Sequence, residues 1–460
     1  MDGLEISEIK FSEMFFENRL DSEYFLKDIL IKDEILDKLA SITIGSFSYV
    51  TDGIHESIEF DDKSNVNLIS AKAPKKNYFD LSGTGFISKS QNEQNPRTQL
   101  KYNDIIVSTV GTIGNCAVVN EEVLPANSDR HVGIVRLNND SVVKPRYLST
   151  FILSKYGQYQ TKRFTTGNVQ PNLFIYKIKD IKVPVISNLW QDKIEGLVLQ
   201  AEELLKDSKK CYKLAEKLLM DELNIKIYST DLVSIKTLAE SFKHSGRLDA
   251  EYYQPKYEQI ETAIKNIKHT YLDVICDVET GEFISETLYG QEGFSYIRGT
   301  DITSHCIDVE NATKVNTTIN GLNVIENGDA AFAMIGSVGN VSINRGTTAI
   351  VSNNLGTIKP HDKKLSNYLL VYLLSDIGQA LFEKYQTRTA QPKIKKEDVG
   401  KFLVPLLSDE EIEFISNKAE ESFRLKEKSK ELLDIAVKAV EMAIETDEES
   451  ALLWLEIQKL

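Results

Sequence analysis

Two long segments of the chain carry apolar or small side chains at alternating spacings of three and four residues. The first segment covers about 188–223 and the second about 408–445, and Glu and Lys crowd the remaining positions. The first seam consists of Leu197, Ala201, Leu204, Ser208, Cys211, Ala215 and Leu218. The second seam consists of Ile412, Ile415, Ala419, Ser422, Lys426, Ser429, Leu433, Ala436, Val440 and Ala443. This alternation is typical of a coiled coil, so each segment is predicted to be one long helix.

Short runs of apolar residues precede each long segment and predict strands. Ile105–Val110 and Gly133–Leu137 are such runs before the first long segment, and Ala330–Ile335 and Gly356–Ile358 are such runs before the second. Shorter helices are expected in matching places, at about 22–40, 145–161, 250–268 and 365–385. Each long helix is therefore predicted to follow a mixed region of strands and short helices.

The sequence contains an internal repeat, and the offset between its repeated landmarks drifts from 228 to 221 residues. Four landmarks return in the same order: Arg19–Phe25 as Arg247–Tyr253, Gly111–Asn115 as Gly336–Asn340, Gln170–Pro171 as Gln391–Pro392, and the strand end Pro184 as Pro405. The glycine-containing pair is predicted to form tight turns in which Gly supplies a positive φ. A period of this length indicates domain duplication rather than a solenoid.

The repeat predicts an α+β chain with two related domains separated by a spacer of two long helices. The expected parts are a first domain with an acidic N-terminal extension, a spacer helix, a second domain, a second spacer helix and a tail, at 1–187, 188–224, 225–407, 408–445 and 446–460. Two equal helices favour antiparallel pairing as a coiled coil, which relates the domains by a pseudo-twofold axis. The alternative is that each helix packs on its own domain.

The net charge of -15 argues at first against a nucleic-acid partner. Its distribution changes that interpretation, because 1–62 carries -11, 405–460 carries -8 and the segment between them carries +4. Acidic residues follow Met1 closely, which argues against a signal peptide. The sequence has no long apolar stretch, so no membrane span is expected. Four widely spaced cysteines are typical of a reduced, cytoplasmic protein.

Basic segments at 155–182 and 384–401 occupy equivalent places in the repeat and suggest contacts with DNA. Lys and Arg neutralise phosphates, Asn and Gln pair with adenine edges, and Arg pairs with guanine edges. The candidate contact residues of the first half are Arg97, Lys101, Arg130, Lys162, Arg163, Asn168, Gln170 and Asn172. Those of the second half are Arg298, Arg345, Asn353, Arg388, Gln391 and Lys393. The alternative is that the lysines are solvated and the Gln-Pro pair is a structural turn.

Four motifs resemble those of a known family, and so does the order of the predicted parts, which is domain, helix, domain and helix. They are Tyr296–Ile302, Asp104–Asn115, Gly167–Leu173 and Ile181–Pro184. Over about 65–445 the chain resembles the DNA-sequence specificity subunit of type I restriction-modification systems. The resemblance implies two target-recognition domains, each reading one half of a split asymmetric site in double-stranded DNA, and spacer helices that set the gap. It also implies a subunit without catalysis or cofactor of its own, with modification subunits that carry S-adenosylmethionine and methylate adenine, and restriction subunits, as partners.

Other classes of protein fit the sequence less well. Asp80–Phe86 faintly resembles the Gly-rich loop of a methyltransferase, but no Asn-Pro-Pro-Tyr segment follows to hold a flipped adenine. The sequence contains no HExxH pair for a metal hydrolase and no GxxxxGK[ST] loop for a nucleotide. A coiled-coil scaffold without enzymatic activity would leave the paired basic segments unexplained. An acidic mimic of DNA would need a continuous acidic surface, whereas here the acidic residues gather at the two ends.

Overall fold

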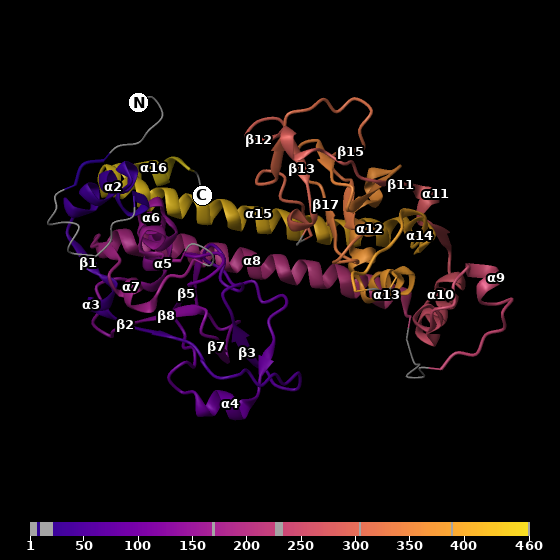
Figure 1. Ribbon diagram of the computed structural model, residues 1–460, viewed down its shortest axis with the longest axis horizontal. Coiled ribbons are helices and arrows are strands. Elements are labelled where there is room, and N and C mark those ends of the chain that lie inside the picture. Colours follow the sequence, from indigo (N-terminus) through magenta and orange to yellow (C-terminus); the bar gives the residue numbers. More distant parts are fainter. Residues whose placement is uncertain are drawn as a thin grey trace. The chain divides into compact units, whose positions relative to one another are not determined.

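The computed structural model describes residues 7–9, 22–167, 171–225, 233–302, 305–387 and 390–458. The chain divides into two compact units, and Figure 1 traces it from the N-terminus in indigo to the C-terminus in yellow. Unit 1 comprises Met1–Leu205 and Glu427–Leu460, and unit 2 comprises Lys206–Lys426. Each of the two long helices, α8 (Asn188–Leu223) and α15 (Asp409–Glu445), begins in one unit and ends in the other. The predicted long helices at 188–223 and 408–445 are thereby confirmed.

Unit 1 contains two sheets and a separate strand pair. The four-stranded sheet has the order β2 (Ser48–Asp52), β8 (Val132–Leu137), β5 (Ile105–Ser108) and β6 (Cys116–Val118), and all its pairings are antiparallel. The three-stranded sheet has the order β4 (Phe86–Ile87), β3 (Val66–Ile69) and β7 (Ala126–Ser128), with β3 and β7 parallel. The pair consists of β1 (Ser41–Thr43) and β9 (Lys182–Pro184). Strand β5 is buried on both faces, which explains its unbroken apolar run.

Unit 2 repeats this topology. Its four-stranded sheet has the order β11 (Cys276–Thr280), β19 (Leu355–Pro360), β16 (Ala330–Ala333) and β17 (Val341–Ile343). Its second sheet has five strands, in the order β12 (Tyr289–Gly290), β14 (Thr313–Val315), β13 (Phe294–Ile297), β18 (Ala349–Val351) and β15 (Val324–Ile325). Here too one pair, β13 and β18, is parallel. The strand pair consists of β10 (His269–Tyr271) and β20 (Leu403–Pro405).

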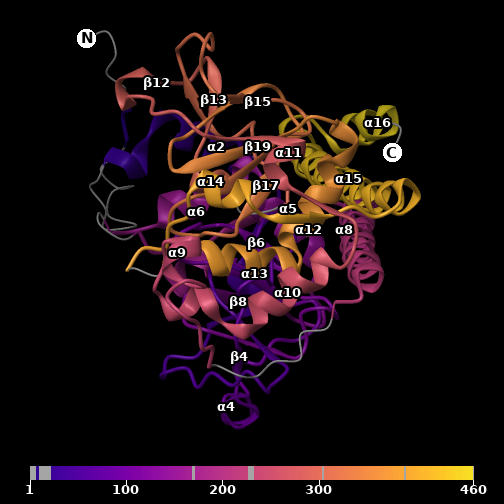
Figure 2. The same ribbon diagram turned by 90° about the vertical axis from the view of Figure 1, so that its right-hand side faces the viewer.

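Short helices surround the sheets in matching places. Those of unit 1 are α2 (Lys27–Asp37), α3 (Ile44–Phe47), α4 (Lys89–Gln94), α5 (Pro145–Leu153), α6 (Lys155–Phe164), α7 (Ile175–Lys179) and α16 (Glu448–Ile457). Those of unit 2 are α9 (Phe242–Ser245), α10 (Pro255–Lys265), α11 (Leu272–Ile275), α12 (Ser366–Leu374), α13 (Asp376–Tyr385) and α14 (Lys396–Gly400). Helices α10 and α13 of unit 2 pack side by side (Figure 2). Among the helices within the described ranges, none is long and apolar enough for a membrane crossing.

The expected single helices at 145–161 and 365–385 are each two helices, so this part of the prediction is wrong. Ser154 and Ser375 interrupt them, and the hydroxyl of each accepts a hydrogen bond at 3.3 Å from the N–H of Gly157 or Gly378. A Cβ on Gly157 would lie 2.4 Å from the backbone of Ile152, so the two helices approach too closely for any other residue. The serine is therefore an N-cap, and the glycine permits the sharp bend.

The long helices contact each other inside each unit through predicted seam residues. In unit 1, Ser429 donates a hydrogen bond from Oγ to the carbonyl of Ala201 at 2.7 Å. In unit 2, Ser208 donates from Oγ to the carbonyl of Ser422 at 2.8 Å. In unit 1, the amide of Ser187, just before α8, also donates a hydrogen bond to the side chain of Glu448, just after α15, at 2.9 Å. Within unit 1 the start of α8 therefore lies beside the end of α15, so the two helices run antiparallel there.

Four of the seven residues predicted for the α8 seam are not fully buried. Ala201, Ser208 and Ala215 are buried as predicted, but Leu197, Leu204, Cys211 and Leu218 are only half-buried. Val198, Tyr212 and Leu219 are buried in their place. The helix packs on its globular unit as well as on α15, so its buried face is wider than a two-position seam.

Candidate nucleic-acid interface

A tight turn with two glycines joins an inner strand of the four-stranded sheet to the edge strand beside it in each unit. We call Gly111–Asn115, between β5 and β6, and Gly336–Asn340, between β16 and β17, the glycine turns. Gly111 and Gly114 have φ values of 69° and 84°, and Gly336 and Gly339 have 82° and 102°. These left-handed values confirm the prediction that both motifs are turns that need Gly.

The segment that carries the Gln-Pro pair closes into a loop beside each glycine turn. We call Thr166–Asn172 and Thr387–Lys393 the Gln-Pro loops. Thr166 and Asn172 exchange backbone hydrogen bonds of 3.0 and 2.9 Å, and the amide of Thr387 donates to the carbonyl of Lys393 at 2.8 Å. Of the predicted contact residues, Asn168, Gln170 and Arg388 lie outside the described residues.

Backbone hydrogen bonds hold each Gln-Pro loop against its glycine turn. In unit 1, the amide of Leu173 donates to the carbonyl of Thr109 at 2.9 Å. In unit 2, the amide of Ile394 donates to the carbonyl of Met334 at 2.9 Å, and the amide of Gly336 donates to the carbonyl of Pro392 at 2.9 Å. Turn and loop therefore form one surface in each unit.

A glutamine that sequence reasoning missed fixes each glycine turn to a helix. Gln158 of α6 donates from Nε2 to the carbonyls of Gly114 and Ile152, at 3.0 and 2.9 Å. Gln379 of α13 donates in the same way to Gly339 and Leu373, both at 2.9 Å. The two glutamines stand 221 residues apart, the offset of the Gln-Pro pairs, so the repeat itself was a signal that could have found them.

Arg163, a predicted phosphate contact, is engaged inside unit 1. Its guanidinium pairs with Asp33, donates to the carbonyl of Tyr24 at 3.1 Å and lies 4.1 Å from the centre of the Tyr24 ring. Only 12% of its side chain is exposed. Arg163 therefore ties α6 to the segment before α2 and offers little surface to a ligand.

Lys384 occupies the equivalent position in unit 2. Its ammonium pairs with Glu261 and lies 4.8 Å from the centre of the Tyr252 ring, and 9% of the side chain is exposed. Burial lowers the pKa of Lys384, because a desolvated ammonium is disfavoured, although Glu261 opposes that effect. Each basic segment thus has at least one cation in a largely buried ion pair.

Two further predicted contacts, Arg97 and Arg345, also pair with carboxylates. Arg97 lies 3.0 Å from Asp52, and 47% of its side chain stays exposed. Burial acts to raise the pKa of Asp52, but hydrogen bonds from His55 and Arg97 lower it overall. Arg345 pairs with Glu420 of α15. Burial likewise acts to raise the pKa of Glu420, and hydrogen bonds from Arg345 and Asn367 lower it overall.

The remaining predicted residues lie at the surface. Those that are exposed are Lys101, Arg130, Lys162, Arg298, Asn353, Gln391 and Lys393, and Asn172 is half-buried. Asn172 and Lys393 hold equivalent places, because each ends its Gln-Pro loop and pairs with the residue before a glycine turn, Val110 or Ile335. The two interfaces thus share a scaffold and present different side chains.

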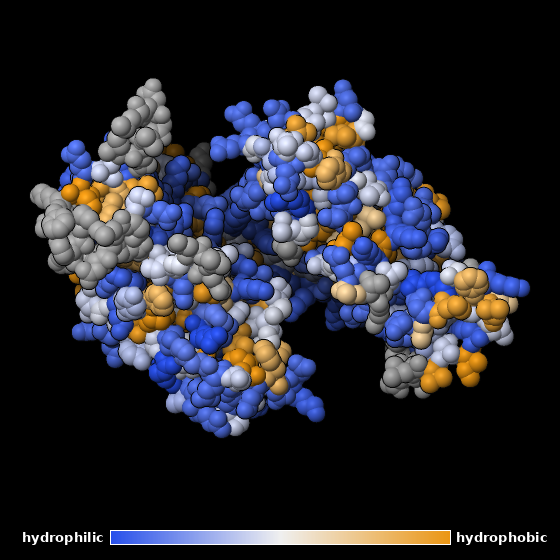
Figure 3. All heavy atoms as spheres, in the orientation of Figure 1, coloured by the Kyte–Doolittle hydropathy of each residue, from blue (hydrophilic) through white to orange (hydrophobic). Residues whose placement is uncertain are grey.

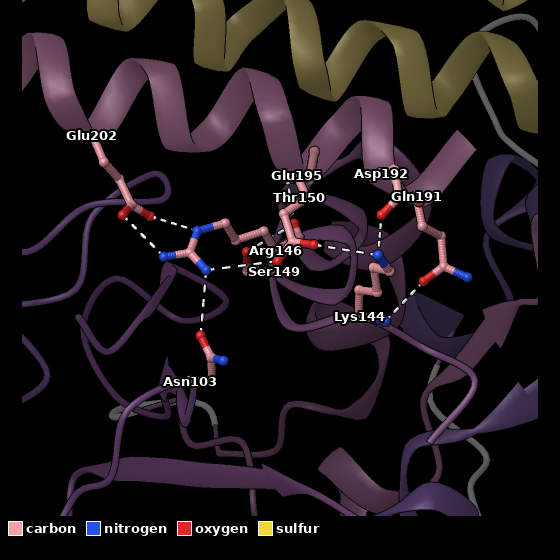
Figure 4. A network of polar contacts seen from close by, with 9 residues as sticks. All are labelled: Asn103, Lys144, Arg146, Ser149, Thr150, Gln191, Asp192, Glu195 and Glu202. Atoms are coloured by element: carbon pink, nitrogen blue, oxygen red, sulfur yellow. Dashed lines mark hydrogen bonds and ion pairs between the residues drawn. The ribbon is translucent and has the colours of Figure 1, made fainter. Parts of the chain in front are cut away.

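A buried arginine that the sequence did not single out joins the globular part of unit 1 to α8 (Figure 4). Arg146 of α5 donates to both carboxylate oxygens of Glu202, at 2.9 and 3.0 Å, and to Asn103 at 3.3 Å. Its side chain is 2% exposed. Burial acts to lower the pKa of Arg146, but the hydrogen bond with Glu202 raises it overall, so the charge is retained. In unit 2, Asn367 makes the matching contact with Glu420, at 3.0 Å.

Hydrophilic side chains make up much of the visible surface, with scattered apolar areas (Figure 3). One apolar area lies around α9, where Leu238, Phe242 and Leu248 are exposed. Next to it, a hollow of about 940 Å³ is lined by charged residues and by Tyr252, Tyr253 and Tyr385. The charges of this hollow are largely paired with one another, as in Lys384 with Glu261, so it offers no net charge to an anionic ligand.

Comparison with known proteins identifies one related family. Residues 265–419 match the model of the family described as type I restriction modification DNA specificity domain. Among solved structures, the chain is similar to the S subunit of a type I restriction-modification system from M. genitalium, with 14% identity, a TM-score of 0.37, and 90% of this chain and 95% of that chain covered. It is also similar to the HsdS subunit from Thermoanaerobacter tengcongensis, with 14% identity, a TM-score of 0.29, and coverage of 88% and 96%.

Proposed function

We propose that the chain is a specificity subunit that reads a split, asymmetric site in duplex DNA. The proposal starts from the match of residues 265–419 to the type I restriction modification DNA specificity domain. Unit 2 contains the matched segment and reads one half of the site. Unit 1 has the same sheet topology and reads the other half.

The observation that carries the proposal is the surface of glycine turn and Gln-Pro loop that recurs once in each unit. Sequence is read by side chains that reach base edges, and register is set by contacts with phosphates. A loop whose two ends are hydrogen-bonded to each other beside a hairpin suits both needs, because the hairpin fixes where the loop begins and ends. Asn172 in one unit and Lys393 in the other show that the two surfaces differ, which supports two different half-sites.

The exposed residues divide into two proposed roles. Lys101, Arg130, Lys162 and Lys393 are proposed to neutralise phosphates. Asn172, Asn353 and Gln391, together with Asn168 and Gln170, are proposed to read adenine edges, and Arg298 and Arg388 to read guanine edges. Arg97, Arg163 and Arg345 are proposed instead to brace the scaffold, because each is paired with a carboxylate.

The long helices are proposed to form an antiparallel coiled-coil spacer that relates two target-recognition domains by a pseudo-twofold axis. In this proposal 1–187 and 225–407 are the domains, 188–224 and 408–445 are the spacer helices, and 446–460 is a tail. The buried serine contacts, Ser208 with Ser422 and Ser429 with Ala201, support a close approach of the two helices. The length of the spacer then sets the gap between the half-sites, as dimer geometry does in other DNA readers.

The partners that this role requires are the catalytic subunits of the complex. Modification subunits that carry S-adenosylmethionine and methylate adenine are proposed to dock on the spacer, and restriction subunits to join them. The chain itself is proposed to perform no catalysis and to hold no cofactor.

Selection from a pool of random duplexes by the full-length chain tests the proposal. We expect two blocks of constant sequence separated by a gap of fixed length and variable sequence, with affinity that falls steeply as salt rises. Each constant block of the selected duplexes should contain an adenine. Methylation of that adenine in the host genome can be measured independently. Enrichment of a single block, or binding indifferent to salt, would contradict the proposal and favour a scaffold. Failure to bind any duplex, together with inhibition of other DNA-binding proteins, would favour an acidic mimic.

A further inference from the structure

Each glycine turn contains two consecutive backbone N–H groups that donate no hydrogen bond to any described residue. Within the part of the chain that the structure describes, the amides of Thr112 and Ile113 donate no hydrogen bond, and neither do the amides of Ser337 and Val338. Thr112 and Ser337 are exposed, and the next residue in each turn is half-buried. Successive N–H groups in a turn of this kind form a concave site for an anion.

The residues around these amides hold each turn in one conformation. Asn115 donates to the carbonyl of Thr112 at 3.1 Å, and Asn340 donates to that of Ser337 at 3.1 Å. The side chain of Ile113 packs against the core of unit 1, and that of Val338 packs against the core of unit 2. With the glutamine bonds from α6 and α13, the amides are fixed before any ligand arrives, so binding costs little ordering entropy.

The space over the turns is open. A Cβ built on Gly111 or on Gly336 would meet no atom within 4 Å. Glycine is therefore present for its positive φ and not because neighbouring atoms crowd it.

We propose that each glycine turn binds one phosphate of the DNA backbone through these two amides. The inference rests on the proposed function, because duplex DNA supplies the phosphate. Backbone amides bind a phosphate on any sequence, so the two turns fix the register of the protein on the duplex while the adjoining Gln-Pro loops read bases. In unit 2, Lys393 pairs with Ile335 beside the turn and adds a cation to the site, whereas unit 1 has the neutral Asn172 in that place. The phosphate site of unit 2 is thus the more dependent on salt.

A carboxylate placed at the turn tests the proposal in the full-length chain. The variants are Ser337→Glu and Thr112→Glu, each with its neutral isostere, Ser337→Gln and Thr112→Gln, and the probe is a duplex obtained by selection together with a scrambled duplex. We expect each Glu variant to bind both duplexes roughly tenfold more weakly than its Gln partner, as loss of a hydrogen-bonded charge implies. The slope of log affinity against log salt should fall by about 0.9 for each phosphate lost. Ser337 and Thr112 are both exposed, so thermal melting of the variants should stay unchanged.

A second measurement localises the phosphate. In a series of duplexes with one neutral methylphosphonate each, one position should weaken binding of the native chain and leave binding of Ser337→Glu unaffected. Equal affinity of the Glu and Gln variants, or a methylphosphonate effect that is additive with Ser337→Glu at every position, would overturn the proposal. The proposed function survives that result if the native chain still selects a split motif, and fails if it selects none.

Discussion

Arg163 and Lys384 illustrate how position in the fold decides what a cation does. Both lie in basic segments, and the charge pattern assigns Arg163 to a contact with DNA. Each instead pairs with a carboxylate, Asp33 of α2 or Glu261 of α10, and lies over a tyrosine ring, Tyr24 or Tyr252. These pairs keep the repeat offsets, so Asp33 and Glu261 were visible in the sequence once the two copies were aligned.

Replacement of Arg163 should affect stability, and replacement of its neighbour Lys162 should not. Arg163→Ala leaves Asp33 largely buried without its cation, which is expected to lower the free energy of unfolding by about 2–4 kcal/mol. Lys162→Ala removes an exposed side chain and should change that free energy by less than about 0.5 kcal/mol. Urea denaturation of both variants measures the difference. Equal stability of the two variants would show that the ion pair contributes nothing.

The two residues that end the Gln-Pro loops should affect binding in different ways. Lys393→Ala is expected to weaken binding to every duplex and to reduce the salt slope by about 0.9, because a phosphate contact carries no sequence information. Asn172→Ala should change base preference in one half-site and leave the salt slope intact. Selection from random duplexes and titration in salt separate the two effects. If both variants behave alike, the division into phosphate and base contacts is wrong.

At the scale of elements, the sequence predicted the two long helices and the short helices at 22–40 and 250–268, where α2 and α10 lie, but it missed a break in each of the other two short helices. The long helices follow from a strong periodic pattern. The breaks at Ser154 and Ser375 do not, because the apolar pattern continues across them and only the close approach at Gly157 and Gly378 makes them necessary.

The break between α5 and α6 predicts opposite effects for two Gly-to-Ala substitutions. Gly157→Ala forces a Cβ to within 2.4 Å of the Ile152 backbone and is expected to cost about 1–3 kcal/mol. Gly196→Ala, in the exposed face of α8, meets no atom within 4 Å and should stabilise by up to about 1 kcal/mol. Thermal unfolding of both variants provides the comparison. A stable Gly157→Ala protein would mean that the helices can separate at this point.

A histidine packed between elements of unit 2 predicts a loss of stability in acid. His305 stacks on Tyr212 of α8 at 3.8 Å between ring centres, and burial, reinforced by Lys426, lowers its pKa to about 4. Between about pH 6.5 and 4, this histidine is protonated in the unfolded chain and neutral in the folded chain. Stability therefore falls as pH falls through that window, by about 3 kcal/mol in all. Unfolding of the native chain and of His305→Phe across this range measures the effect. Parallel curves for the two proteins would contradict it.

For the whole molecule, the overall net charge conceals a positively charged middle segment that holds the repeated surfaces. The net charge of -15 sums two acidic ends and a middle segment of +4, and both glycine turns and both Gln-Pro loops fall in that middle segment. The landmarks of the repeat were readable from the sequence, whereas the sheet topology and the surroundings of each candidate contact residue were not, because both depend on contacts between residues distant in the sequence. Asn172 and Lys393 share one place in the scaffold and present different chemistry.

The proposed spacer predicts that the gap between half-sites follows helix length. Insertion of a second copy of Glu202–Ser208 into α8 and of Ser422–Lys428 into α15 adds seven residues to each helix and preserves the three-four spacing. Seven residues lengthen a helix by about 10 Å, or about three base-pair steps of 3.4 Å. Selection from random duplexes should then return the same two blocks with a gap longer by about three base pairs. Insertion into α8 alone serves as the control, because it shifts Ser208 away from Ser422 and should destabilise the chain instead. An unchanged gap in the double insertion would refute the spacer role and leave the reading of the half-sites intact.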